Sequence, residues 1–152
     1  MSVMGSPERL GRATRSAPSS TLYVRVNPAA DDPFKEWVED AVVELLASLR
    51  GALPPPSSDI AAPVTVAVIV ALPPTMDDDP WRAAAGNALV EAVRGIVGSI
   101  TMELGNAVRI NTIVTRDEGA QATQDALGFL SSPRASFVAG STFDLGGAEC
   151  AS

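Results

Sequence analysis

Side chains that could carry out chemistry are few in this sequence, and most of them lie in two short acidic stretches. Asp77, Asp78 and Asp79 precede Pro80, and residues 116–118 add an arginine and two carboxylates. Carboxylates serve as general acids or bases, and they bind divalent cations when several of them converge. Asp79 before Pro80 is also typical of a helix N-cap followed by the first helical residue. Because no second set of ligands accompanies the aspartates, we interpret them as a cap rather than a metal site.

The other reactive residue types are almost absent. The sequence contains no histidine and one cysteine, Cys150, which lies close to the C-terminus. Ser–His and Cys–His catalysis within the chain are therefore excluded, and so is an internal disulfide. Tyr23 is the only tyrosine and Lys35 the only lysine, and they are too far apart in sequence to lie one helical turn from each other.

Composition indicates one α/β domain with no polyanionic partner. The 152 residues are 46% hydrophobic but only 5% aromatic, so the core must consist mainly of aliphatic side chains, which suits a parallel sheet covered by helices. The net charge of −7 argues against a nucleic-acid partner. The longest apolar run, residues 64–72, is too short to span a membrane, and residues 1–20 lack the apolar core of a signal peptide. We therefore expect no membrane partner and a cytoplasmic location.

Apolar periodicity predicts alternating strands and helices after a disordered tail at residues 1–20. The α/β domain is assigned to residues 21–148 and a short C-terminal tail to 149–152. The expected strands and helices, in order, are residues 21–27, 33–53, 64–72, 80–104, 107–115, 120–130 and 137–145. This β-α-β-α-β-α-β order predicts a doubly wound parallel sheet with right-handed crossovers. The run VTVAVIVAL at 64–72 predicts its central strand.

The two long helices carry the clearest patterns. Asp32 is the expected cap of helix 33–53, whose apolar stripe includes Trp37 and Leu46. Helix 80–104 is interrupted by three glycines, at positions 86, 95 and 98, each of which costs roughly 1 kcal/mol relative to alanine. We interpret these glycines as places where another backbone packs closely, and Gly105 with Asn106 as the helix C-cap.

The segment Phe129–Gly147 (FLSSPRASFVAGSTFDLGG) is the most distinctive part of the sequence. Together with MELG at 102–105 and VRINTI at 108–113, it resembles the C-terminal half of the short-chain dehydrogenases/reductases. A weaker likeness extends back to VNPAA at 26–30, which is similar to the family's V-N-N-A-G. The resemblance implies a partial Rossmann-like fold.

The same resemblance implies that the family's active site has been lost. The glycine-rich turn that holds NAD(P) is missing, because Gly5 and Gly11 follow no strand. The family's catalytic Tyr-x-x-x-Lys pair falls on Gly86 and Val90, and its serine falls near Pro73. We therefore expect no catalytic residue, no bound cofactor and no metal in this chain.

Other features of the family are shortened or replaced. Its structural asparagine falls at about Glu44, its Pro-Gly bend is replaced by Thr115 and Arg116, and the loop that covers the substrate is cut to a few residues.

The parts that remain are those through which the family assembles. In the family, the two long helices form a four-helix bundle with a second subunit, and the last helix and strand form another contact. The resemblance therefore implies a subunit interface, for which we expect the following residues: Trp37, Leu46, Trp81, Leu89, Val93, Ile96, Ile100, Phe137 and Phe143.

The leading hypothesis is a non-catalytic subunit, a pseudoenzyme, that supports or regulates an intact NAD(P)-dependent short-chain dehydrogenase. The partner would supply both the cofactor and the Tyr/Lys pair. The alternatives are a small enzyme with repurposed chemistry at Asp77–Asp79 and residues 116–118, a self-associating module that binds a small apolar ligand, and a decayed gene product.

Overall fold

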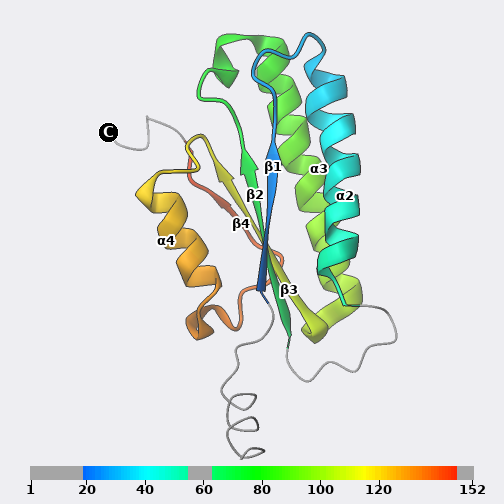
Figure 1. Ribbon diagram of the computed structural model, residues 1–152, viewed down its shortest axis with the longest axis vertical. Coiled ribbons are helices and arrows are strands. Elements are labelled where there is room, and N and C mark those ends of the chain that lie inside the picture. Colours follow the sequence, from blue (N-terminus) through cyan, green and yellow to red (C-terminus); the bar gives the residue numbers. More distant parts are fainter. Residues whose placement is uncertain (1–18, 55–62, 147–152) are drawn as a thin grey trace, which may run out of the picture.

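Four parallel strands form the sheet at the centre of the chain. The computed structural model describes residues 19–54 and 63–146. Within them, the strand order is β1-β2-β3-β4, and every neighbouring pair is parallel (Figure 1). The strands are β1 (Ser19–Arg25), β2 (Val64–Ala71), β3 (Val108–Thr115) and β4 (Thr142–Asp144). The predicted α/β fold with a parallel sheet is confirmed. The tail residues 1–18 and 147–152 lie outside the described residues.

The helices begin and end close to the predicted residues. A π-helical turn, η1 (Phe34–Asp40), runs into α2 (Ala41–Ala52), and α3 spans Pro80–Leu104 as predicted. The last long helix is α4 (Gln121–Leu130). Three 3₁₀ turns complete the set: η2 (Met76–Asp78), η3 (Gly105–Ala107) and η4 (Pro133–Ala135). No helix of the described ranges is long and apolar enough to cross a membrane.

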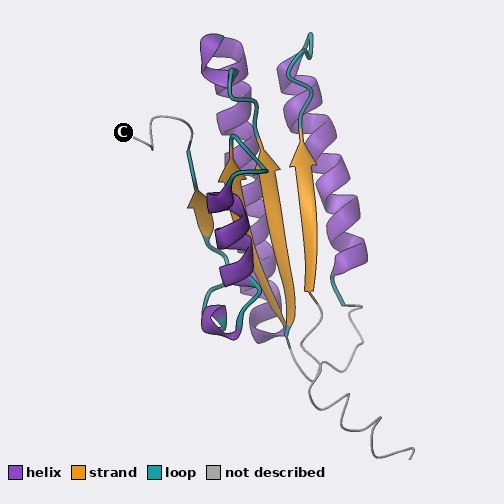
Figure 2. Cartoon of the chain, turned by 60° about the vertical axis from the view of Figure 1, so that its left-hand side comes forward, coloured by secondary structure: helices purple, strands orange, loops and turns teal. Residues whose placement is uncertain are grey.

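The helices cover opposite faces of the sheet, and this corrects the expectation that all crossovers are right-handed. α2 and α3 lie together on one face, whereas α4 lies alone on the other (Figures 1 and 2). From β1 to β4, each strand nevertheless lies on the same side of the strand before it. The first two crossovers are right-handed, so the third, from β3 through α4 to β4, has the opposite hand, which is rare in βαβ units.

The larger core lies between the sheet and the α2–α3 pair. Side chains of β2 from Val64 to Val70 are all buried, which confirms the prediction of a central strand. Val66, Val68 and Val70 face α2 and α3, and Ile69 belongs to the smaller cluster under α4. A strand buried on both faces requires this uninterrupted apolar run.

The buried stripe of the first helix differs from the predicted one. The buried residues are Trp37, Ala41, Leu45 and Leu49, spaced four apart, whereas Leu46 is 46% exposed. At about 100° per residue, Leu45 lies about 80° from Trp37 around the helix axis and Leu46 about 180°, so Leu45 shares the buried side. The indole Nε1 of Trp37 also donates a hydrogen bond to the carbonyl of Asn27 (2.8 Å), which anchors this turn to the loop after β1.

The last strand is shorter than predicted because a side chain of β3 binds the segment before it. Asn111 is buried; its Nδ2 donates to the Val138 carbonyl (3.0 Å) and its Oδ1 accepts from the Ser141 amide (3.0 Å). Gly140 adopts a positive φ of 73° and donates to the Ile110 carbonyl (2.7 Å). Residues 137–141 therefore run beside β3 as a loop, and Phe137, predicted to lie in the strand, is 98% exposed.

Candidate functional site

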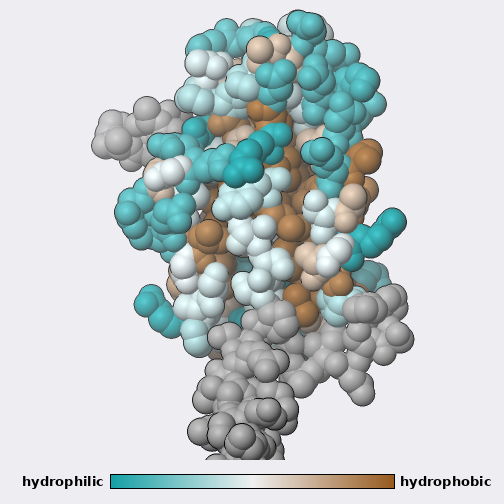
Figure 3. Space-filling view, in the orientation of Figure 1, coloured by the Kyte–Doolittle hydropathy of each residue, from teal (hydrophilic) through white to brown (hydrophobic). Residues whose placement is uncertain are grey.

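The carboxyl ends of the parallel strands meet at one edge of the sheet, where open α/β folds place their ligands. The loops after β1, β2 and β3 all reach this edge, which is at the top of Figure 1. In the same view, Figure 3 shows that hydrophilic residues cover the top of the molecule and that apolar residues are visible lower down. The candidate acidic residues of the sequence are therefore gathered at the expected place.

Two of the three aspartates at residues 77–79 form ion pairs with arginines at this edge. Arg116 Nη2 lies 3.1 Å from Asp77 Oδ2, which joins the loops after β3 and β2. Arg82 Nη1 lies 2.6 Å from Asp79 Oδ2. The other oxygen of Asp79 accepts a hydrogen bond from the Trp81 amide (2.9 Å), so the predicted N-cap of α3 is confirmed. The hydrogen bond from the Trp81 amide lowers the pKa of Asp79, and the hydrogen bond from Arg82 lowers it further. Asp79 is therefore an ionised cap rather than a proton donor.

A third ion pair links the two outer loops of this edge. Arg25, at the end of β1, donates from Nε and Nη2 to the two carboxylate oxygens of Glu118, both at 2.8 Å. The Arg25 guanidinium also lies 4.2 Å from the centre of the Tyr23 ring. The charged groups of residues 116–118 are thus arranged as separate pairs. No group of three or more metal-ligating side chains occurs in residues 19–54 and 63–146.

The Glu118 pair predicts an acid-sensitive contribution to stability. Hydrogen bonds from Arg25 lower the pKa of Glu118 below its ordinary value of 4.5, and the opposing effect of burial is smaller. A carboxyl whose pKa is lower in the folded state stabilises the fold above its unfolded pKa, and this contribution is lost as the pH falls through the folded pKa. We expect Glu118→Gln to destabilise the chain at neutral pH, by a small amount because both side chains are partly exposed. Urea unfolding should show this difference shrinking well below pH 4.5.

A matched control for this experiment is Glu91→Gln, which removes an exposed carboxylate 3.6 Å from Arg94 on α3. We expect little effect from that change at either pH. A Glu118→Gln deficit of the same size at neutral and acidic pH would contradict the electrostatic explanation.

The positions on which the sequence resemblance places the dehydrogenases' catalytic groups are packed with apolar atoms. Gly86 is buried, and a Cβ added to it would lie 2.1 Å from the sulfur of Met76. Met76 is itself 2% exposed. Val90, one turn further along α3, packs against the main core, and Pro73 is buried. No side chain other than hydrogen fits at Gly86 unless Met76 moves.

Several residues that hold this edge together could not be predicted directly from the sequence. Arg82 donates from Nε to the Pro28 carbonyl (3.2 Å) and from Nη2 to the Ala30 carbonyl, so it ties the loop after β1 to α3. The buried hydroxyls of Thr115 and Thr123 lie 3.0 Å apart and join β3 to α4. The spacing of Asp79 and Arg82, three residues apart on a helix, was the one available hint.

A shallow pocket of about 330 Å³ lies where the two long helices begin. Phe34 and Trp81 meet edge to face there, with ring centres 6.1 Å apart. Asp31, Asp32, Asp79 and Arg82 form the polar part of its lining. Asp32 Oδ1 accepts a hydrogen bond from the Lys35 amide (3.2 Å), in line with its predicted role at the start of this helix. Asp32 and Asp79 in this lining therefore cap helices, and Arg82 forms an ion pair with Asp79.

The expected interface residues separate into core and surface. Trp37, Leu89 and Val93 have no exposed surface and pack inside the chain itself, so for these three the interface expectation is wrong. Ile96, Ile100 and Phe143 are partly buried against the two core clusters. Leu46, Trp81 and Phe137 are exposed to 46%, 70% and 98% respectively. Only the last two groups retain surface with which to touch another chain.

Comparison with known proteins identifies the fold. No family model and no curated protein sequence matches this chain. Among solved structures, it is similar to the enoyl-acyl-carrier-protein reductase (NADH) from Aquifex aeolicus VF5, at 15% identity and a TM-score of 0.51 over 92% of this chain and 65% of the other. The fold is that of the short-chain dehydrogenases and reductases. The chain thus spans slightly less than two thirds of the length of that reductase.

Two further structures share this dehydrogenase fold. A 3-ketoacyl-ACP reductase from Sinorhizobium meliloti 1021 is 17% identical, with a TM-score of 0.51 over 93% of this chain and 71% of the other. A 4-hydroxyisoleucine dehydrogenase, solved with NADH and succinate, is 19% identical, with a TM-score of 0.50 over 99% of this chain and 77% of the other. At these identities the similarity establishes the fold and leaves activity open.

Proposed function

We propose that this chain is a non-catalytic subunit of the dehydrogenase fold, which assembles with an intact NAD(P)-dependent short-chain dehydrogenase and supports or regulates it. The observation that carries the proposal is the contact between Gly86 and Met76. The position that matches the catalytic tyrosine is filled by a buried thioether, with 2.1 Å between its sulfur and the place of a Cβ. Proton transfer needs a titratable group there, and this chain has none. NAD(P) and the Tyr/Lys pair would belong to the partner subunit.

The outer surface of α3 supports assembly through the long helices. Gly95 and Gly98 lie in the middle of this helix, and a Cβ on either would meet no atom within 4 Å. Close packing inside the chain therefore does not explain them, although each costs roughly 1 kcal/mol in a helix. A second backbone lying against this surface would explain why no side chain projects there.

Neighbouring apolar side chains extend this surface. Met102 on α3 is 84% exposed, and Val43 and Leu46 on α2 are 67% and 46% exposed. The two helices lie side by side on one face of the sheet (Figure 1). Exposed apolar residues on two neighbouring helices are typical of a surface that packs against another chain.

The test is co-expression of this chain with full-length short-chain dehydrogenases encoded near it, followed by size-exclusion chromatography with light scattering. We expect a stable mixed complex with one of them. Gly95→Trp should weaken that complex by at least about tenfold, because the new ring projects from the proposed interface while clashing with nothing in the isolated chain.

The matched control is Gly128→Trp on α4, since Gly128 also has open space around it but lies on the opposite face of the sheet. This variant should bind like the wild type. In parallel, NAD(H), NADP(H) and acyl-CoA should leave the melting temperature of the isolated chain unchanged. The proposal fails if no dehydrogenase forms a complex, if Gly95→Trp binds normally, or if the isolated chain binds a nicotinamide cofactor.

A further inference from the structure

The outer edge of β1 is the least protected part of the sheet. β1 pairs with β2 along seven residues, Ser19–Arg25, and within the described residues no strand lies on its other side. The outward amide and carbonyl groups of an edge strand form a ready template for another strand. Natural proteins usually protect such an edge with charged residues, proline or a covering segment.

β1 also lacks the features that usually prevent edge pairing. The strand contains no proline, lysine or acidic residue, and its one charge, Arg25, stands at its end. That charge is compensated by Glu118 at 2.8 Å and lies over the ring of Tyr23. In a chain with a net charge of −7, this edge is therefore a locally uncharged strip of Ser, Thr, Leu, Tyr and Val. Two copies would not repel each other along it.

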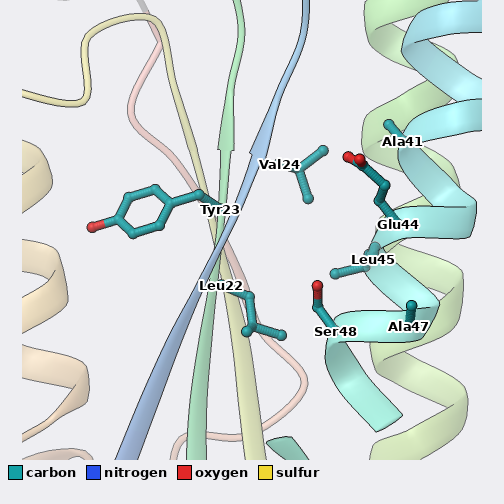
Figure 4. A pocket seen from close by; sticks show the side chains of 8 residues that line it. All are labelled: Leu22, Tyr23, Val24, Ala41, Glu44, Leu45, Ala47 and Ser48. Atoms are coloured by element: carbon teal, nitrogen blue, oxygen red, sulfur yellow. The ribbon is translucent and has the colours of Figure 1, made fainter. Parts of the chain in front are cut away.

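A groove of about 340 Å³ runs along this edge between β1 and α2. Figure 4 shows Leu22 and Val24 pointing toward α2, and Leu45 meets them from the helix. Tyr23 points to the opposite face of the sheet, where 43% of its surface is exposed. A strand added beside β1 would place alternate side chains in this groove and the others beside Tyr23.

We propose that β1 pairs with β1 of a second copy of this chain, antiparallel about a two-fold axis perpendicular to the sheet. The result is one continuous sheet of twice four strands. Antiparallel edge strands are common beside otherwise parallel sheets. This interface is separate from the outer face of α2 and α3. A test of the β1 dimer is therefore independent of a test of the proposed function.

The chemistry of β1 fits a second copy of itself. The two-fold axis keeps the α2 side of both copies on the same face, so Leu22 and Val24 of the second copy lie on the groove side. There the groove combines apolar Leu45 with the polar side chains of Glu44 and Ser48. The register that sets Leu22 opposite its own copy also sets Tyr23 opposite Thr21. Aromatic side chains beside β-branched ones are stabilising cross-strand pairs. Every position of the strand thus meets a compatible neighbour.

The test compares the full chain with Thr21→Lys by sedimentation equilibrium over a range of concentrations. We expect the wild type to form a dimer of twice 15.7 kDa. Thr21→Lys should raise the dissociation constant by at least about tenfold, because an edge lysine adds like charges across the seam. Ala122→Lys is the matched control, since it adds the same charge on the exposed side of α4 and should leave the dimer intact.

Hydrogen exchange supplies a second readout that does not depend on a variant. Amides of β1 should become better protected as the protein concentration rises, whereas those of the central strand β2 should not change. A full chain that stays monomeric, or a dimer that survives Thr21→Lys, would overturn the proposal. So would a dimer that forms only after residues 2–17 are deleted, because the chain's own N-terminal segment would then occupy this edge.

Discussion

Gly86→Tyr is expected to destabilise the isolated chain by about 3 kcal/mol, although it introduces the residue that the sequence resemblance places here in catalytic short-chain dehydrogenases. The glycine is buried, and the sulfur, Cε and Cγ of Met76 lie 2.1, 3.1 and 3.3 Å from the position of a Cβ. A phenol ring needs that volume and more, and Met76 is enclosed at 2% exposure. Urea unfolding followed by circular dichroism measures the loss.

The matched control is Gly95→Tyr on the same helix. Its Cβ would meet no atom within 4 Å, and tyrosine is a better helix former than glycine, so this variant should be as stable as the wild type or slightly more stable. Shortening the obstructing side chain by Met76→Ala should recover part of the stability of Gly86→Tyr. If Gly86→Tyr is as stable as Gly95→Tyr, the site can still hold a catalytic side chain, and the main support for a non-catalytic subunit is removed.

Asn111→Leu is expected to cost about 3 kcal/mol, because it breaks two hydrogen bonds at once. The side chain is 1% exposed, donates to the Val138 carbonyl and accepts from the Ser141 amide, both at 3.0 Å. Each partner left unsatisfied costs ~1–3 kcal/mol. The loop 138–141 should also detach from β3, which hydrogen exchange at Gly140 and Ser141 would detect.

The neighbouring residue offers a control of opposite sign. Thr112 is equally buried, but its hydroxyl has no hydrogen-bond partner among residues 19–54 and 63–146. Thr112→Val removes this unsatisfied group and should be neutral or stabilising. Equal losses for Thr112→Val and Asn111→Leu would mean that β3 responds to any change of volume, and that the Asn111 hydrogen bonds have no special role.

Local chemistry in the sequence was sufficient to locate the long helices and the central strand. Helix α3 has the predicted bounds, Pro80–Leu104, because Asp79 and Pro80 form a standard helix start and Gly105 ends it. The uninterrupted apolar run at Val64–Ala71 could only be a strand covered on both faces. The likeness to the dehydrogenases was confirmed at the level of fold, since this alternation of strands and helices specifies a parallel sheet.

Tertiary structure decided which side of each element faces the core. Leu45 rather than Leu46 is buried because the helix turns the side that carries Trp37, Ala41 and Leu49 toward the core. The hand of the last crossover depends on which face of the sheet remains free once α2 and α3 have packed together. Neither property is encoded in a single segment, because both arise when several segments compete for one surface.

The tertiary structure also decided which glycines of α3 lie in close contact with another part of the chain. The sequence indicated close backbone contacts at three positions of α3. Within the chain, only Gly86 has such a contact, and its neighbour is the side chain of Met76 rather than a backbone, whereas Gly95 and Gly98 face open space. Composition and periodicity thus determined the parallel α/β architecture and the lack of histidine chemistry. Side chains brought together from distant segments decided that position 86 is closed to a larger side chain, because packing volume belongs to the whole fold and not to any one stretch of sequence.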